Sequence, residues 1–314
     1  MVQPNSLKAW FLAARPKTLT GAIAPVLVGA AFSIRTFVAS GVQFSNVSSQ
    51  ILPFLLCILF AVLMQIDANF INDYFDFKKG TDREDRLGPE RACAQGWITP
   101  KAMRYGIGVI LCLASIAGLV ALSLCWKSLP YYGIELLATG VVCIIFAFLY
   151  TYGLSYMGLG DVLVLIFFGL VPVCGTYYIQ AHEITTPAIL LGFIAGISID
   201  ALLVINNFRD REQDRISGKK TLVVLLGERF GLFHYMAIPI ISCWFAILLC
   251  YFIGGRQLYF QLVGLVYLSL HIYAWVKMRE IRSGKALNHI LGLTSRNMFI
   301  FALLLATAII FANR

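Results

Sequence analysis

Residues 51–82 have the sequence ILPFLLCILFAVLMQIDANFINDYFDFKKGTD, which indicates both the class of the protein and the place of its chemistry. No charged residue occurs between Ile51 and Ile66. Because a helix needs about 20 apolar residues to cross the hydrocarbon of a bilayer, we expect a membrane-spanning helix over residues 51–74. Polar and acidic residues crowd the far end of this helix, so a functional site is expected there.

The same apolar pattern recurs along the whole chain. Hydrophobic residues make up 59% of the 314 residues and charged residues 13%, against roughly 45–50% and 25% in soluble domains. This composition argues against a disordered, collagen-like or soluble α/β protein. The gaps between charged residues predict nine spans, at residues 18–38, 51–74, 104–126, 131–153, 159–180, 185–206, 231–253, 257–276 and 296–313. These stretches are too long for barrel strands, so we expect an all-α, polytopic membrane protein.

The distribution of Lys and Arg orients the predicted helices. With the N-terminus inside, 21 of the 25 basic residues fall on the inner side. The positive-inside rule then predicts an N-in, C-out chain. Residues 1–17 lack the pattern of a cleaved signal and predict an interfacial helix over Ser6–Ala14, with Trp10 and Phe11 at headgroup depth. We expect residues 1–314 to form one transmembrane domain, with residues 77–103 and 207–230 as cytoplasmic loops at the active site.

Acidic residues concentrate in two segments at the predicted inner side. Twelve of the 16 Asp and Glu residues lie within residues 67–90 and 200–228. Asn72 and Asp76 are four residues apart, as are Asn206, Asp210 and Asp214, so each set lies along one helical face. Each set ends an apolar span, which suggests a weak internal duplication. Ionisable groups at membrane depth are costly and usually functional.

Two such motifs facing one another suit the binding of Mg²⁺ and a diphosphate. Mg²⁺ prefers oxygen ligands and commonly binds through one or two carboxylates together with substrate phosphates. The candidate metal ligands are Asn72, Asp73, Asp76, Asp82, Asn206, Asp210 and Asp214. Bound metal would stabilise diphosphate as a leaving group, with an apolar allylic chain held among the helices. Asp67 and Asp200 lie deeper, where a helix–helix contact and a ligand role are equally plausible.

Cations on the predicted inner side are candidates for binding the substrates. These are Arg15, Lys17, Arg86, Arg91, Lys219 and Lys220. Arg15 and Lys17 are equally explained as topology anchors beside the membrane. Tyr150 is a further candidate, because the loop that follows it contains no Lys or Arg and is therefore expected to cover a pocket.

The remaining residue types narrow the chemistry. Asp161 ends the uncharged loop after Tyr150, where it could be a base, a substrate contact or a helix N-cap. The four histidines have no metal-binding spacing and are predicted to be structural. The eight cysteines contain no CxxC pair, so neither disulfides nor a zinc site are expected. No nucleic-acid-binding pattern is present, and the inner cations are expected to contact anionic lipid.

At these motifs the chain resembles the intramembrane aromatic prenyltransferases of the UbiA superfamily. The resemblance rests on Asn72-Asp73-x-x-Asp76, on Asp210-x-x-x-Asp214 and on the nine-span plan. The commoner family pattern places its last Asp four residues after the middle one, whereas Asp82 follows Asp76 by six. Within the superfamily, the chain is most similar to the branch that prenylates 1,4-dihydroxy-2-naphthoate. Four stretches carry that similarity: residues 15–20 (RPKTLT), Asp82 with residues 86–91 (RLGPER), residues 96–99 (GWIT), and residues 206–210 with 218–222.

The resemblance implies a reaction and a place for it. A polyprenyl diphosphate would donate its chain to 1,4-dihydroxy-2-naphthoate in a Mg²⁺-dependent reaction that releases CO₂ and diphosphate and forms a demethylmenaquinone. Asp76, Asp210 and Asp161 would be the catalytic residues, at the cytoplasmic face of a bacterial inner membrane. Two alternatives stay open: a sister enzyme that prenylates 4-hydroxybenzoate or haem, and a secondary transporter, although transporters usually bind substrate at broken helices near the midplane.

Overall fold

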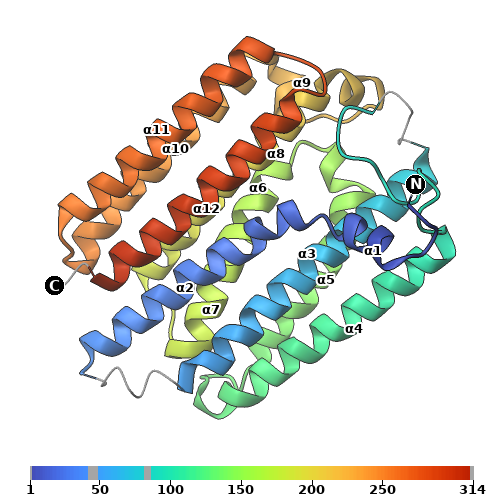
Figure 1. The fold of residues 1–314 in the computed structure, drawn as a ribbon. Coiled ribbons are helices and arrows are strands. Elements are labelled where there is room, and N and C mark those ends of the chain that lie inside the picture. Colours follow the sequence, from blue (N-terminus) through green and yellow to red (C-terminus); the bar gives the residue numbers. More distant parts are fainter. Residues whose placement is uncertain (1, 42–48, 81–85, 312–314) are drawn as a thin grey trace.

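A computed structural model describes residues 2–41, 49–80 and 86–311 and forms one bundle of long helices (Figure 1). Among these residues there is no strand, and nine helical segments are long and apolar enough to cross a membrane. The helices are α1 (Leu7–Ala14), α2 (Leu19–Ala39), α3 (Ile51–Lys79), α4 (Pro100–Cys125), α5 (Ile134–Tyr152), α6 (Gly160–Val164), α7 (Val171–Ala181), α8 (Thr186–Ile216), α9 (Leu222–Leu226), α10 (Glu228–Ile253), α11 (Gln257–Ile281) and α12 (Leu287–Phe311). The all-α, nine-span prediction is therefore confirmed.

The main difference from the predicted spans is that two helices continue beyond their apolar parts. Helix α3 runs on to Lys79 and α8 to Ile216, so the first ten residues of the predicted loop 207–230 are helical. Burial explains the extension of α8, because Phe208 is fully buried in a cluster with Val223 of α9 and Tyr235 of α10. Both acidic motifs thus lie on rigid helices that project past the apolar core.

The N-terminal segment forms a short helix at the predicted place, α1. Ser6 caps α1, with its hydroxyl accepting a hydrogen bond from the backbone N–H of Ala9. Phe11 is exposed, but Trp10 packs on Phe70 of α3, with 5.3 Å between ring centroids. The indole fills the space beside Gly106, where any added Cβ would lie 2.5 Å from the ring. The depth of Trp10 and Phe11 in a bilayer stays a prediction.

A close approach between two helices positions the middle of the bundle. Helix α6 continues through a π-helical segment, Leu165–Leu170, into α7, and this segment crosses α8 at Gly192 and Gly196. A Cβ at Gly196 would lie 2.9 Å from the carbonyl oxygen of Leu165. Small residues four apart permit such contact between membrane helices. The contact holds α6, whose second residue is Asp161, against α8.

Two apolar clusters flank the space in which a substrate can bind. One joins α2, α7, α8, α10, α11 and α12 around Tyr177, Tyr267 and Phe301, and the other joins α1, α3 and α4 around Ile71 and Met103. Figure 1 shows α12 ending at the opposite end of the bundle from α1, as an odd number of crossings requires. The cavities described below lie between the two clusters.

Candidate functional site

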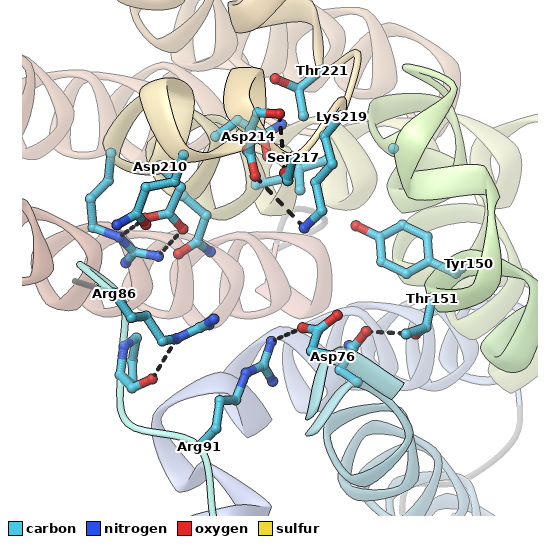
Figure 2. A pocket seen from close by; sticks show the side chains of 18 of the residues that line it. Asp76, Arg86, Arg91, Tyr150, Thr151, Asp210, Asp214, Ser217, Lys219 and Thr221 are labelled. Atoms are coloured by element: carbon cyan, nitrogen blue, oxygen red, sulfur yellow. Dashed lines mark hydrogen bonds and ion pairs between the residues drawn. The ribbon is translucent and has the colours of Figure 1, made fainter. Parts of the chain in front are cut away.

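The two acidic motifs meet across one polar cavity of about 410 Å³ at one end of the bundle. Asn72 and Asp76 approach it from α3, and Asn206, Asp210 and Asp214 from α8. Figure 2 shows Asp76 on one side of the cavity and Asp210 and Asp214 on the other. The extended helices bring together residues that lie 134 positions apart in the chain.

Three neighbouring polar residues on α3 have different partners. Asp76 forms a 2.6 Å ion pair with Arg91, whose side chain is only 7% exposed. Asn72 accepts a hydrogen bond from the hydroxyl of Thr151 on α5. Asp73 lies outside the cavity lining, and its two carboxylate oxygens accept the backbone N–H groups of Ala92 and Cys93 at 2.8 and 2.9 Å. Asp73 thus holds the loop that carries Arg91, and the candidate metal ligands on α3 are Asn72 and Asp76.

The α8 side of the cavity is organised by Arg209. Its guanidinium donates to both carboxylate oxygens of Asp210, at 2.7 and 2.6 Å, and to Oδ1 of Asn288 at 2.8 Å. Asn288, at the start of α12, donates through Nδ2 to the carbonyl of Leu87 at 2.8 Å. Asn288 therefore connects α8 to the loop over residues 86–91, which contributes two arginines to the cavity.

Cations surround the cavity on every side. It is lined by Arg15, Lys79, Arg86, Arg91, Arg209 and Lys219, together with Tyr150 and Asp161. Four of the six predicted substrate-binding cations, Arg15, Arg86, Arg91 and Lys219, line the cavity, as does the predicted Tyr150. Lys17 and Lys220 are exposed and lie outside the lining, and Asp82 falls outside the described residues.

The uncharged loop between α5 and α6 packs against the cavity rim through Tyr156. Nζ of Lys79 lies 4.6 Å and Nζ of Lys219 5.4 Å from the centre of the Tyr156 ring. The backbone N–H of Lys220 donates to the carbonyl of Tyr156 at 3.1 Å. Burial disfavours the charged form of Lys219, but the carboxylates of Asp214 and Asp76 outweigh burial and raise the pKa of Lys219. Lys219 therefore stays protonated beside Asp214, with 3.7 Å between Nζ and Oδ1.

An apolar cavity of about 560 Å³ opens from the polar one and runs among α2, α3, α4, α5, α7 and α8. Six residues line both cavities and mark their junction: Arg15, Thr18, Asn72, Tyr150, Leu203 and Asn206. Nδ2 of Asn206 donates to the carbonyl of Leu202 at 2.8 Å, which turns its Oδ1 away from that carbonyl. A molecule with a charged head and a greasy tail fits this pair of cavities.

The donor set of the polar cavity suits magnesium. Its candidate ligands, Asn72, Asp76, Asn206, Asp210 and Asp214, offer only carboxylate and amide oxygens, which hard divalent cations prefer. The same carboxylates already pair with Arg91, Arg209 and Lys219. Those cations can turn to phosphate oxygens when a metal takes their place, so the residues fit a metal–diphosphate complex.

Several residues of the site were missed from the sequence. Lys79, Thr151, Arg209 and Asn288 carry no spacing signal of their own, and only the bundle brings them to the acidic motifs. His234 was predicted to be structural, yet its ring lies between the carboxylates of Asp161 and Asp200. The motif of α8 included Arg209 as a neighbour of Asp210, but nothing local indicates its contact with α12.

The fold and the cavity pair define the class of this protein as a polytopic membrane protein whose polar, oxygen-rich site opens into an apolar cavity. A model of the UbiA prenyltransferase family matches residues 22–303, and the chain belongs to that family. It is 37% identical over 254 residues to the 1,4-dihydroxy-2-naphthoate octaprenyltransferase of Haemophilus influenzae. The match covers 79% of this chain and 77% of the relative.

Two further comparisons extend the likeness over the full length. The 1,4-dihydroxy-2-naphthoate octaprenyltransferase of Mycobacterium tuberculosis is 33% identical over 311 residues, covering 98% of this chain and 99% of the relative. The solved structure of a UbiA homolog from Archaeoglobus fulgidus, bound to GPP and Mg²⁺, matches with a TM-score of 0.64 over 96% of this chain and 99% of that one. At 14% identity that likeness shows the shared fold.

Proposed function

We propose that this chain transfers a polyprenyl group from polyprenyl diphosphate to 1,4-dihydroxy-2-naphthoate, in a Mg²⁺-dependent reaction that releases CO₂ and diphosphate and forms a demethylmenaquinone. The observation that carries the proposal is the cation-ringed cavity with oxygen donors on α3 and α8, which opens into an apolar cavity. The printed activity of the relatives supports the choice of donor and acceptor.

The donor spans the two cavities. Its diphosphate lies in the polar cavity, where Arg86, Arg91 and Lys219 supply charge-assisted hydrogen bonds to phosphate oxygens. Its chain lies in the apolar cavity. The reacting allylic carbon is then at the junction, beside Tyr150 and Asn206.

The metal ligands in this proposal are Asn72, Asp76, Asn206, Asp210 and Asp214. Bound Mg²⁺ supplies positive charge that stabilises the departing diphosphate. The protein's own part is to hold these oxygens on two rigid helices, because preorganised groups need no rearrangement as charge develops. Asp210 is held in place by both arms of Arg209.

The acceptor enters at the same junction. Its electron-rich ring attacks the allylic carbon as the carbon–oxygen bond of the donor breaks. Arg15 lines both cavities and can bind the acceptor's carboxylate, and Asp161 lies at the rim as a base for a ring hydroxyl. Apolar walls exclude water, which would otherwise capture the cation.

The site faces the cytoplasm in this proposal, in the inner membrane of a bacterium. The end of the bundle that holds the polar cavity is also the end at which most of the 25 basic residues gather, which the positive-inside rule places on the cytoplasmic side. The N-terminus is then inside and the C-terminus outside. Labelling of single added cysteines in intact cells tests this topology.

The direct test is an assay of the purified protein in lipid nanodiscs with octaprenyl diphosphate. 1,4-Dihydroxy-2-naphthoate labelled in its carboxylate, 4-hydroxybenzoate and haem are offered separately, each with Mg²⁺ or with EDTA. We expect a prenylated naphthalenediol and labelled CO₂ only with the naphthoate and Mg²⁺. Prenylation of 4-hydroxybenzoate or haem alone would instead assign a sister activity.

Matched variants test the metal site in the same assay. Asp76→Asn and Asp210→Asn are expected to lower kcat by about 10²–10³-fold, the cost of losing one transition-state donor in other enzymes. Glu212→Gln is the control, because Glu212 is exposed on α8 and its ion pairs are with Arg215 and Arg211, neither of which lines the polar cavity. Full activity in both Asn variants would refute the assigned metal ligands.

A further inference from the structure

Behind the polar cavity lies a cluster of three ionisable side chains that belongs to neither acidic motif. Asp161 is at the start of α6, Asp200 in the middle of α8 and His234 near the start of α10. Nε2 of His234 lies 3.3 Å from Oδ2 of Asp200, and its Nδ1 lies 3.8 Å from Oδ1 of Asp161. The close contact between the π-helical segment and α8 holds α6 against α8, and α10 packs separately along α8.

The cluster leads from the cavity into the bundle. Asp161 lines the polar cavity, as does Tyr150. Asp200 is six residues before Asn206 on α8, which places it about 9 Å deeper along the helix axis. Asp200 is 7% exposed, and its Oδ1 is buried without a hydrogen-bond partner among the described residues. A charged or polar group buried in this way at membrane depth is costly and is normally retained for function.

The geometry favours a proton over a metal ion between these groups. The two nitrogens of one imidazole ring face two different carboxylates, whereas a histidine that binds a single ion uses one nitrogen. An imidazole between two carboxylates can hold one proton and pass it to either neighbour. The cluster therefore has the composition of a proton store with one member, Asp161, at the cavity.

We propose that Asp161 takes the hydroxyl proton of the aromatic acceptor and later returns it, with His234 and Asp200 as positioning residues that stabilise Asp161 in both states. This inference rests on the proposed function, because it needs an acceptor that carries both a ring hydroxyl and a neighbouring carboxylate.

With such an acceptor, the proton that Asp161 removes in the first step is the one that the product needs in the last step. The O–H bond breaks and its proton moves to Asp161, while the ring carbon that bears the carboxylate bonds to the allylic carbon. The donor's C–O bond breaks, and its electron pair leaves with diphosphate. The ring oxygen is then a ketone next to a carbon that bears the carboxylate.

Loss of CO₂ completes the cycle. The bond between ring and carboxylate breaks, its electron pair moves through the ring to the ketone oxygen, and that oxygen takes the proton back from Asp161. No net proton is released in the cycle. An acceptor that loses a ring hydrogen releases one proton per turnover, which a base must pass on to water. A base embedded among membrane helices suits the first kind of acceptor.

The test compares acceptors whose hydroxyl groups differ in acidity. A series of 1,4-dihydroxy-2-naphthoates with electron-withdrawing substituents on the distant ring is offered to the nanodisc enzyme and to Asp161→Asn, His234→Asn and Asp200→Asn. His182→Asn is the control, because His182 lies at the opposite end of α7 with φ of 63°, a backbone conformation that Asn tolerates.

We expect Asp161→Asn to lower kcat/KM for the unsubstituted acceptor by about 10²–10⁴-fold, the range of general-base catalysis. His234→Asn and Asp200→Asn should lower it by about 10-fold, and all three variants should recover as the acceptor becomes more acidic. Mg²⁺-dependent thermal stabilisation by geranyl diphosphate should be unchanged in the His234 and Asp200 variants. Unchanged stabilisation shows that the variants fold and bind the donor, so a lower kcat/KM reflects a local effect. His234→Gln is a second variant at the same position, in case His234→Asn does not fold.

Three results are decisive. If His234→Asn and Asp200→Asn show the same dependence on acceptor acidity as the native enzyme, the proton store is refuted. Elemental analysis that finds a metal bound by the native protein and lost in His234→Asn also refutes it, in favour of a metal centre. If the native enzyme forms no naphthoate product at all, the proposed function fails first, and this inference with it.

Discussion

Asn288 offers a sharp test of the site, because it is absent from both acidic motifs and its side chain makes two hydrogen bonds within the part of the chain that the structure describes. Asn288→Ala removes the bond to the carbonyl of Leu87 and the bond from Arg209, each 2.8 Å long. A neutral hydrogen bond contributes about 1 kcal/mol and one to a charged group about 1.5–3 kcal/mol. Because Asn288 is only half-buried, water can replace part of the lost hydrogen-bond energy in the variant.

A net loss of about 2 kcal/mol remains. If that energy serves to order Arg209 and the loop over residues 86–91, kcat/KM for the donor should fall about 30-fold. The assay is initial-rate prenylation at varied octaprenyl diphosphate with saturating acceptor. Asn288→Asp separates the two bonds, because it keeps an acceptor for Arg209 and loses the donor to Leu87.

His289→Ala is the matched control, since His289 is the next residue and is exposed. It should retain native kinetics. We expect Asn288→Asp to fall between the control and Asn288→Ala. Native kcat/KM in Asn288→Ala, with a native melting temperature, would falsify the claim that this residue organises the α8 side of the cavity.

Three further predictions follow from the same contacts. Asp73→Asn should lower the melting temperature, because one of the two hydrogen bonds from the backbone of the 91–93 loop to the carboxylate is lost. Its Mg²⁺ affinity, measured by calorimetry, should fall less than that of Asp76→Asn. An equal loss of affinity would make Asp73 a metal ligand. The pKa of Lys219 is raised in the folded protein. The stabilisation from its charged form is therefore fully present below the ordinary lysine pKa of about 10.4, and it is lost only as pH rises through the higher pKa of the folded state. The pH profiles of kcat/KM from 6 to 9 should therefore have the same shape in the native enzyme and in Lys219→Arg. Lys219→Gln should have a lower kcat/KM over this whole range. Gly196→Ala should destabilise the protein by about 1–3 kcal/mol through overpacking, whereas Gly108→Ala, with open space around the added Cβ, should be neutral or stabilising in a thermal melt.

The family relationship and the cavity contribute different parts of the conclusion. Membership of the UbiA prenyltransferase family defines the reaction class, and the relatives' names point to a naphthoate acceptor. The cavity shows how this chain can perform such a reaction, because its polar and apolar parts meet at Tyr150 and Asn206.

Much of the architecture was predictable from the sequence because it depends on composition and spacing along single helices. Runs of apolar residues define nine spans, since lipid cannot satisfy an exposed backbone. The four-residue spacing of Asn72 with Asp76, and of Asp210 with Asp214, places each pair on one helical face. Both properties are local, so no contact between helices is needed to predict them.

Contacts between helices decided the rest. Asp73 and Asp76 are three residues apart and both contact the 91–93 loop, yet Asp73 accepts its backbone N–H groups whereas Asp76 pairs with Arg91 and lines the cavity. Lys17 and Lys219 are both basic residues on the predicted inner side, but of the two Lys219 alone lines the cavity. The partners of Asn288 and His234 lie far from them in the sequence. Spacing along the chain therefore does not predict these contacts. Sequence spacing therefore determined the helices and their polar faces, and tertiary packing decided which polar groups meet.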